Sequence, residues 1–260
     1  MADSETVFDA KLTTFQQWQT TPWGRLRYSI AAANLMPHLH HAGRVLDVAG
    51  GNGLDAIELA ARGHHVTIVD ISEPALADAR ALAAKQGVGD RISTQRLGVD
   101  ELARRFAHDQ FDVVLCHNLI QYVPDPRTLI AVLAAMVAPN GVVSVIAPNA
   151  DADPLLTAVR DLDLEEALRQ LDSSTRHTVT YDTETRACYA DSVIDDLAEA
   201  GLHLRARCGI RSVCDLLVDD TRKDDPMFFA QLERLELAMS TRAPYSYTAR
   251  FFQLVAGPAR

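Results

Sequence analysis

A glycine-rich turn at residues 47–53, which read Asp-Val-Ala-Gly-Gly-Asn-Gly, carries the clearest chemical signal in this chain. Glycine permits a sharp turn and lets a ligand approach the backbone closely. A short apolar run (44–48) precedes the turn, an amphipathic run (54–63) follows it, and Asp70 ends the next apolar run. A carboxylate there can accept hydrogen bonds from both hydroxyls of a ribose. This order of strand, glycine turn, helix, strand and acid predicts a site for a nucleoside-containing cofactor.

Two other interpretations of the turn are open. A dinucleotide-binding NAD enzyme would carry the spacing G-x-G-x-x-G, whereas this chain reads D-x-A-x-G-x-G, which disfavours that class. A helix cap and tight turn with no ligand is the second alternative, and the acid at Asp70 argues against it.

The elements that must position this turn alternate between strand and helix patterns. Apolar, β-branched runs are expected as strands at 44–48, 64–70, 91–98, 111–118 and 142–148. Helical patterns are expected at 25–41, 54–63, 72–87, 99–106 and 125–141, the first of them bent or ended by Pro37. Such alternation implies parallel strands joined by right-handed crossovers. We therefore expect an α/β chain with a Rossmann-like, doubly wound sheet and helices on both faces.

The pattern changes near Asn149. Residues 151–172 form a leucine-spaced helical stretch with seven acids against two arginines, and residues 173–190 are polar and irregular. Later patterns predict helices at 191–201 and 226–240 and strands at 202–213 and 247–257. We expect a cofactor-binding core with an N-terminal helix over 1–148, a helical cap inserted over the acceptor site at 149–190, and the rest of the core with a helical acceptor-side segment at 191–260.

Composition narrows the class of protein. The 260 residues include 25 Lys and Arg against 35 Asp and Glu, a net charge of −10, and 48% are hydrophobic. That apolar fraction fills a core, which excludes disorder, collagen and coiled coil as descriptions of the whole chain. The acidity argues against binding nucleic acid by bulk charge, although a local basic pocket is compatible with it.

The cysteines and apolar runs bound the setting. Cys116, Cys188, Cys208 and Cys214 form no C-x-x-C pair, and no histidine cluster has metal-ligand spacing, so we expect reduced thiols and no metal site. No apolar run approaches the roughly 20 residues that span a bilayer. The N-terminus lacks the apolar region of a signal peptide. We expect a cytoplasmic protein with no membrane partner.

Six segments stand in the order and spacing of one enzyme family: TTPWGRLRYSI (20–30), RVLDVAGGNG (44–53), RGHHVTIVDIS (62–72), CHNLIQYVPDPRTLI (116–130), GIRSVCDLL (209–217) and RAPYSYTARFFQLVA (242–256). On these segments the chain resembles the tRNA 5-carboxymethoxyuridine methyltransferases, a family of class I methyltransferases that use S-adenosylmethionine (SAM). The resemblance covers most of the chain and is weakest at 150–200. It implies a seven-stranded sheet with an antiparallel last strand, SAM as cofactor, and methyl transfer to a carboxylate oxygen on the wobble base of a tRNA anticodon.

The resemblance also implies roles for individual residues. Arg27 would pair with the methionine carboxylate of SAM, because its planar fork matches a carboxylate; the alternative is an ordinary surface arginine. Asp70 would hold the ribose, and Ile71 and Val99 would lie beside the adenine. The residues implied to bind the cofactor are Arg27, Ala49, Gly50, Gly51, Asp70, Ile71, Val99 and His117.

His117 has two possible roles. It follows the fourth predicted strand, near the methyl group that the resemblance implies is transferred. An unperturbed histidine titrates near pH 6.5 and suits general-base catalysis. A carboxylate acceptor is already ionised and needs no base, so we favour a hydrogen-bonding wall of the cofactor pocket over a catalytic base.

Two late segments supply candidates for binding the acceptor. Arg211, Tyr245, Tyr247 and Arg250 lie on segments that often cover the crevice of this fold, and an anionic acceptor needs such donors. The alternative is a set of surface ion pairs, such as Arg250 with an acid of the 233–236 helix.

The chain departs from the family in the segment after the fifth strand. The family carries a lysine-rich stretch there, whereas residues 169–182 read RQLDSSTRHTVTYD and follow the acidic stretch 151–172. A tRNA footprint needs several phosphate contacts from Lys or Arg. Three hypotheses therefore stand. The first is a tRNA carboxyl methyltransferase. The second is an O-methyltransferase of a small molecule, a carboxylate or hydroxyl metabolite or natural product, with 149–190 as a lid. The third is a SAM-binding protein that acts as a non-catalytic partner.

Overall fold

The computed structural model describes residues 2–178 and 183–259, and side chains from residue 11 onward. A seven-stranded sheet has the order β3-β2-β1-β4-β5-β9-β8. The strands are β1 (Arg44–Val48), β2 (His65–Asp70), β3 (Ile92–Arg96), β4 (Phe111–His117), β5 (Val137–Pro148), β8 (His203–Ile210) and β9 (Phe251–Gly257). The first five strands are parallel, and β9 runs antiparallel to both β5 and β8. The expected seven-stranded sheet with an antiparallel last strand is confirmed.

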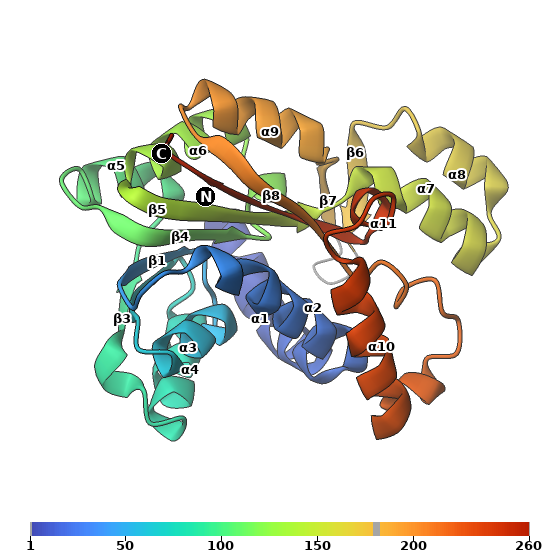
Figure 1. The fold of residues 1–260 in the computed structure, drawn as a ribbon, viewed down its shortest axis with the longest axis horizontal. Helices are drawn as coiled ribbons and strands as arrows, with labels where there is room; N and C mark the ends of the chain where they lie inside the picture. Colours follow the sequence, from blue (N-terminus) through green and yellow to red (C-terminus); the bar gives the residue numbers. More distant parts are fainter. Residues whose placement is uncertain (1, 179–182, 260) are drawn as a thin grey trace.

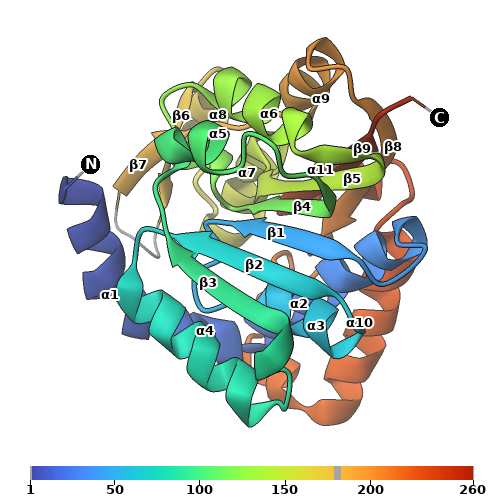
Figure 2. The ribbon, with the colours of Figure 1, turned by 90° about the vertical axis from the view of Figure 1, so that its left-hand side faces the viewer.

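Helices cover both faces of the sheet (Figures 1 and 2). One face carries α5 (Leu102–Arg105), α6 (Pro126–Ala135) and α9 (Ala190–Glu199). The other carries α2 (Pro22–Leu35), α3 (Leu54–Ala61), α4 (Glu73–Lys85) and α10 (Pro226–Met239). Short 3₁₀ turns lie at Met36–His38, Gly89–Arg91, Val99–Glu101, Ile120–Tyr122, Ala150–Ala152 and Thr221–Asp224.

Capping side chains set where several helices begin. The hydroxyl of Thr21 accepts the Gly24 amide at the start of α2, and that of Ser72 accepts the Ala75 amide at the start of α4. Pro22 then occupies the first turn of α2, where a missing N–H costs nothing. These caps fix where α2 and α4 begin, whereas α3 begins directly at Gly53 of the glycine turn without a side-chain cap.

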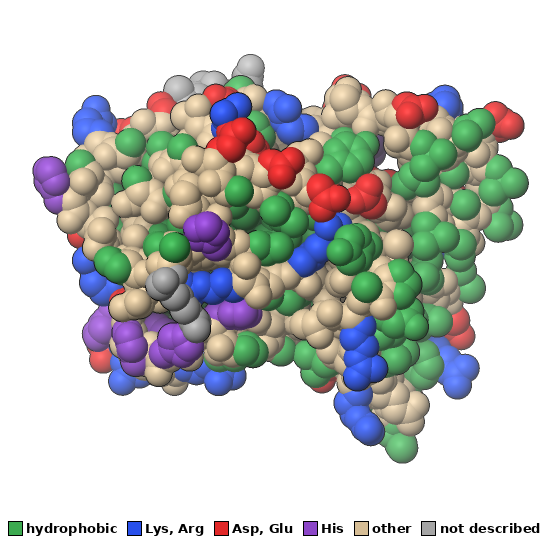
Figure 3. Space-filling model, turned by 45° about the horizontal axis from the view of Figure 1, so that its top comes forward, with side chains coloured by type: hydrophobic (Ala, Val, Ile, Leu, Met, Phe, Trp, Pro, Cys, Tyr) green, Lys and Arg blue, Asp and Glu red, His purple; other side chains and the backbone are tan. Residues whose placement is uncertain are grey.

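The segment after β5 forms a helical hairpin and a small ribbon beside the sheet. Helix α7 (Asp153–Leu156) continues as a π-helical turn, η6 (Thr157–Asp161), and packs against α8 (Leu164–Gln170). Strands β6 (Thr175–Thr178) and β7 (Thr183–Arg186) pair antiparallel. Figure 3 shows hydrophobic side chains gathered at the right-hand end of the molecule, where Figure 1 has α7 and α8.

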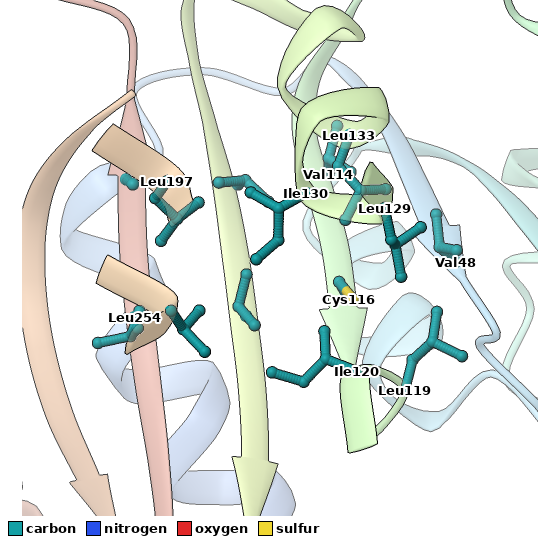
Figure 4. Packing of buried hydrophobic residues seen from close by; sticks show 14 of the residues in the cluster. Val48, Val114, Cys116, Leu119, Ile120, Leu129, Ile130, Leu133, Leu197 and Leu254 are labelled. Atoms are coloured by element: carbon teal, nitrogen blue, oxygen red, sulfur yellow. The ribbon is translucent and has the colours of Figure 1, made fainter. Parts of the chain in front are cut away.

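Buried apolar side chains join the layers. Figure 4 shows Ile130 and Leu133 of α6 and Leu197 of α9 packed over Val114 of β4 and Leu254 of β9. All four cysteines are buried and unpaired. Burial of this kind contributes roughly 1.5–3 kcal/mol per large side chain. The core thus holds the carboxyl ends of β1, β2, β4 and β5 at one edge.

Several predicted boundaries are wrong. Irregular structure was expected at 173–190, but the described part of this range contains the β6–β7 ribbon. Polar side chains such as Thr175 and Glu184 pair across the ribbon, so its sequence lacks the alternation of apolar residues that would indicate a strand. The predicted strand at 247–257 begins only at Phe251, because α11 (Tyr245–Thr248) precedes it. The helix α1 (Ala2–Thr20) was not expected, since its polar composition hides any apolar face. The division of the chain at residues 148 and 190 stays a prediction.

In the described part of the chain, no helix is long and apolar enough to cross a membrane, and no cluster of three His, Cys, Asp or Glu side chains could hold a metal ion.

Candidate functional site

A cavity of about 1720 Å³ opens at the carboxyl edge of the parallel strands. Ligand pockets are usually about 300–1,000 Å³, so this space can hold two ligands at once. Its walls include ten of the residues singled out in the sequence: Arg27, Ala49, Gly50, Gly51, Asp70, Ile71, Val99, His117, Arg211 and Arg250. Residues 250 and 27 are far apart in the chain, so the fold brings the two predicted groups to one space.

The glycine turn forms the floor of the cavity. Ala49, Gly51 and Gly53 have φ values of 55°, 55° and 75°, in the left-handed region. A Cβ on Gly50 would lie 2.4 Å from Oδ2 of Asp47 and 2.8 Å from Ile68, so only glycine fits there. Ala49 tolerates a backbone that costs an L-residue about 1–2 kcal/mol.

Asp70 ties this turn to the next crossover. Its Oδ2 accepts the Gly51 amide at 2.9 Å, and its Oδ1 accepts the Ser72 amide at 2.9 Å. Asp70 also lines the cavity. It therefore orients the turn and presents a carboxylate, a good acceptor for hydroxyl groups, to a ligand there.

Arg27, Asp55 and His117 form a buried chain of charges at the centre of the cavity. Arg27 is 2% exposed, and its Nη1 donates to Oδ2 of Asp55 at 2.5 Å. Nδ1 of His117 lies 2.9 Å from the same oxygen. Burial alone would raise the pKa of Asp55, but Arg27 and His117 outweigh burial and hold that pKa well below its usual value. Asp55 is therefore an anion that fixes both neighbours.

The far side of His117 is also occupied. Its Nε2 lies 2.9 Å from Oγ of Ser144, and that hydroxyl accepts from Nε2 of Gln253 at 3.1 Å. The ionised carboxylate of Asp55 can only accept, so Nδ1 of His117 carries the imidazole proton, and Nε2 accepts from the hydroxyl of Ser144. Burial lowers the pKa of His117 despite the opposing effect of Asp55, so the neutral form dominates near neutral pH. Neither ring nitrogen has a free lone pair with which to act as a base.

Two buried atoms at this end have no partner among the described residues. They are Nε of Arg27, a donor, and Oδ2 of Asp47, an acceptor, and both residues line the cavity. Burial, reinforced by Asp55, raises the pKa of Asp47 well above its usual value, although Arg27 opposes the shift. Unsatisfied buried groups cost about 1–3 kcal/mol each. A ligand that carries both a carboxylate and an ammonium group would satisfy both, so the site fits an amino-acid moiety.

A second polar group gathers at the other end, against the β6–β7 ribbon. Asp153 accepts Nε and Nη2 of Arg176 at 2.8 and 2.7 Å, and its Oδ1 also accepts Nη1 of Arg250 at 2.8 Å. Burial and the neighbouring Arg176 lower the pKa of Arg250. Two guanidinium groups thus share one carboxylate, which leaves this end of the cavity electropositive.

Arg211 is a further guanidinium on the cavity wall. Burial would lower its pKa, but Asp215, which accepts from its Nε at 2.7 Å, raises it. Its guanidinium carbon lies 5.9 Å from the ring centre of Trp18 and 5.4 Å from that of Phe251. Its backbone φ is 64°, a strained value for a residue with a Cβ. These restraints fix the side chain on the cavity wall.

The structure separates Tyr245 from the other acceptor-side candidates. Tyr245 is 42% exposed and is not among the residues that line the cavity, because it starts the short helix α11 on the outer surface. Arg250, which does line the cavity, pairs with Asp153 at the start of α7; the alternative partner was an acid of the 233–236 helix.

Sequence reasoning missed Asp55, Ser144, Asp153 and Arg176. Asp55 stands in the first turn after the glycine turn, where an acid favoured by the helix dipole is common, so its position alone was uninformative. Asp153 and Arg176 are 23 residues apart in the segment of weakest resemblance, and only the fold brings them together.

Comparisons with known proteins agree with this geometry. A family model described as a methyltransferase domain matches residues 45–141. The chain is 27% identical over 241 residues to the tRNA 5-carboxymethoxyuridine methyltransferase of Escherichia coli K12, which covers 91% of this chain and 89% of the relative. It is 31% identical over 175 residues to the ubiquinone biosynthesis O-methyltransferase of Acinetobacter baylyi, covering 65% of this chain and 69% of the relative.

Solved structures share the fold. The 1,6-didemethyltoxoflavin-N1-methyltransferase of Burkholderia thailandensis, with its substrate and S-adenosylhomocysteine bound, aligns with a TM-score of 0.62 at 18% identity. The alignment covers 100% of this chain and 88% of the other.

Proposed function

The chain belongs to the class I SAM-dependent methyltransferases, and on that premise we propose that it transfers the methyl group of SAM to a carboxylate oxygen of an anionic acceptor. The observation that carries the proposal is the convergence of Arg176, Arg211 and Arg250 on the cavity, with Arg176 and Arg250 sharing the single carboxylate of Asp153. A buried excess of guanidinium charge stabilises an anion and repels a cation.

The opposite end of the cavity suits SAM. We assign the carboxylate of its methionine to Arg27 and its ammonium to Asp47, whose unpartnered buried atoms have the matching hydrogen-bonding character. Asp70, a carboxylate on the cavity wall, would accept the ribose hydroxyls. Ile71 and Val99, on the same wall, would lie beside the adenine, and Ala49, Gly50 and Gly51 would support the cofactor from below.

The chemistry asks little of the protein beyond positioning. SAM supplies a methyl group on a positively charged sulfur, which the acceptor oxygen attacks as the carbon–sulfur bond breaks and the sulfur keeps the electron pair. A carboxylate is already ionised, so no proton moves and no base is needed. The arginines hold the oxygen in line, and exclusion of water favours a step in which opposite charges cancel.

His117 fits a positioning role in this scheme. Both of its nitrogens are hydrogen-bonded, to Asp55 and Ser144, and its pKa is lowered by burial. It therefore holds Asp55, and through Asp55 the guanidinium of Arg27, in one orientation. This supports the wall interpretation of His117 over the general-base interpretation.

For the identity of the acceptor, we propose the carboxymethoxy group on the wobble base of a tRNA. The E. coli enzyme named for that activity aligns with 91% of this chain. The ubiquinone O-methyltransferase relative aligns with 65% of it. A cavity that exceeds the usual size for one ligand leaves room for an extruded base beside SAM.

A small anionic metabolite is the second candidate for the acceptor, because the surface beside the cavity is acidic. The stretch 151–172 has seven acids against two arginines, and it flanks the arginine end. Negative charge there disfavours the approach of a phosphate backbone, whereas a small carboxylate can pass into the cavity.

Labelled SAM distinguishes the two acceptors. The protein is incubated with labelled SAM and either tRNA that carries carboxymethoxyuridine or a tRNA-free metabolite extract. Transfer to the modified tRNA, and not to the same tRNA without the carboxymethoxy group, supports the first candidate. Label in the metabolite fraction alone would replace it with the second.

A further inference from the structure

The helical hairpin formed by α7, η6 and α8 turns its apolar side chains outward. Six of them, which we call the hairpin face, are exposed by the following fractions: Leu155 42%, Val159 41%, Leu162 79%, Leu164 69%, Leu168 62% and Leu171 61%. Figure 3 shows the corresponding concentration of hydrophobic side chains at the right-hand end of the molecule. Nothing in the described part of the chain covers this face.

The spacing of these residues is regular. Leu155, Val159 and Leu162 follow one another at i, i+4 and i+7, and so do Leu164, Leu168 and Leu171. In α8 that spacing places Leu164, Leu168 and Leu171 on one face. The other three lie along α7 and the π-helical turn η6, with Leu162 at its end in the left-handed region. Ala167 of α8 packs inward, at 7% exposed, while the larger leucines beside it stay outside. An apolar stripe of this size is normally buried, so the exposed one forms a surface that lacks its partner.

The area of the hairpin face matches that of an interface. The exposed fractions correspond to apolar surface on the order of 600 Å², at the upper limit of about 300–600 Å² for the largest patch of a typical monomer. A standard interface buries about 800 Å² per partner, of which about 65% is apolar in homodimers. The hairpin face alone therefore supplies the apolar area that one side of a homodimer requires.

We propose that the hairpin face is a homodimer interface, on which the same hairpin of a second copy docks around a two-fold axis to form a four-helix bundle. Two helices that each present an apolar stripe are half of such a bundle, and a two-fold axis brings identical patches together. With the two α8 helices antiparallel, Leu168 lies near the axis and meets its counterpart. Leu164 of each copy then faces Leu171 of the other.

Acidic residues adjoin the hairpin face in sequence, namely Asp161, Asp163 and Glu165. Their charge disfavours a nucleic-acid backbone or an anionic lipid surface as the occupant. The matching apolar area is what favours a second copy.

Sedimentation analysis of the full chain over a wide concentration range tests the proposal. We expect a dimer whose dissociation constant rises by about 100-fold or more in Leu168→Glu, because the substitution places two carboxylates at the axis. Met227→Glu is the matched control, since Met227 is 74% exposed on α10, away from the hairpin. It should leave the dimer intact. Both variants change side chains that are exposed in a single copy, so far-UV circular dichroism and SAM binding should match the wild type.

Cross-linking gives a second, independent readout. All four native cysteines are buried, so a cysteine placed on the surface is the reactive thiol. Leu168→Cys should form a disulfide-linked dimer under mild oxidation, whereas Met227→Cys should not.

A wild-type protein that stays monomeric throughout would overturn the proposal, and so would a dimer that Leu168→Glu leaves unchanged. Binding of the monomer to phosphatidylglycerol vesicles or to tRNA, lost in Leu168→Glu, would assign the hairpin face to that ligand instead.

Discussion

Replacement of Asp70 by alanine tests the assignment of the cofactor site most cleanly. The carboxylate of Asp70 accepts the amides of Gly51 and Ser72 and lines the cavity, where we assign it the ribose hydroxyls. A hydrogen bond to a charged group contributes about 1.5–3 kcal/mol. Loss of two such bonds at the lower figure amounts to about 3 kcal/mol, so Asp70→Ala should weaken SAM binding about 100-fold.

Calorimetry with two ligands separates the ribose contacts from any effect on the glycine turn. Wild type and variant are each titrated with S-adenosylhomocysteine and with its 2′-deoxy analogue. If Asp70 binds the hydroxyl, the wild type prefers the hydroxylated ligand and Asp70→Ala loses that preference. Asp100→Ala is the matched control, because Asp100 also lines the cavity and has no assigned ribose contact. A variant that keeps the full preference, or binds SAM as tightly as the wild type, would refute the assignment.

Three further predictions address the other groups. His117→Ala should weaken SAM binding about tenfold, since it releases Asp55 and Arg27, while kcat at saturating SAM changes little; a collapse of kcat alone would identify a general base. Arg250→Ala should raise the KM of a carboxylate acceptor about 100-fold without changing the affinity for SAM in calorimetry, and an unchanged KM would remove Arg250 from the acceptor site. Asp47→Asn should stabilise the ligand-free protein at about pH 8. The pKa of Asp47 is raised in the folded protein, so ionisation of this carboxyl destabilises the wild type as the pH rises, whereas asparagine does not ionise. Thermal melts should show the gap closing towards about pH 4, and parallel melting curves across this range would contradict the raised pKa.

The core of the fold was predictable because its signals are local. The run 44–48, the glycine turn and Asp70 each specify a conformation by themselves, and their order fixes a parallel sheet with a site at its carboxyl edge. Arg27 and His117 were identified through a resemblance that spans most of the chain. The described structure then adds what no local pattern contains, namely that Asp55 joins the two.

The acceptor side was less predictable for a physical reason. Asp153, Arg176 and Arg250 come from a helix start, a short ribbon and the segment before β9, so their meeting depends on tertiary packing alone. Tyr245 was singled out for its type and proximity in sequence, but a four-residue helix turns it to the outside. Acidic residues in 151–172 were visible in the sequence, whereas the outward direction of its leucines was not.

The stability of the product to base tests directly whether the methyl group is transferred to a carboxylate oxygen. A methyl ester of a carboxylate is hydrolysed by mild base and releases methanol, whereas a methyl ether or an N-methyl group is not. After incubation with SAM labelled in the methyl group and with the acceptor that takes up label, the product is treated with base and volatile label is collected. We expect the label to be released as methanol, because the product is a methyl ester. Label that remains on the acceptor after this treatment would contradict methyl transfer to a carboxylate oxygen.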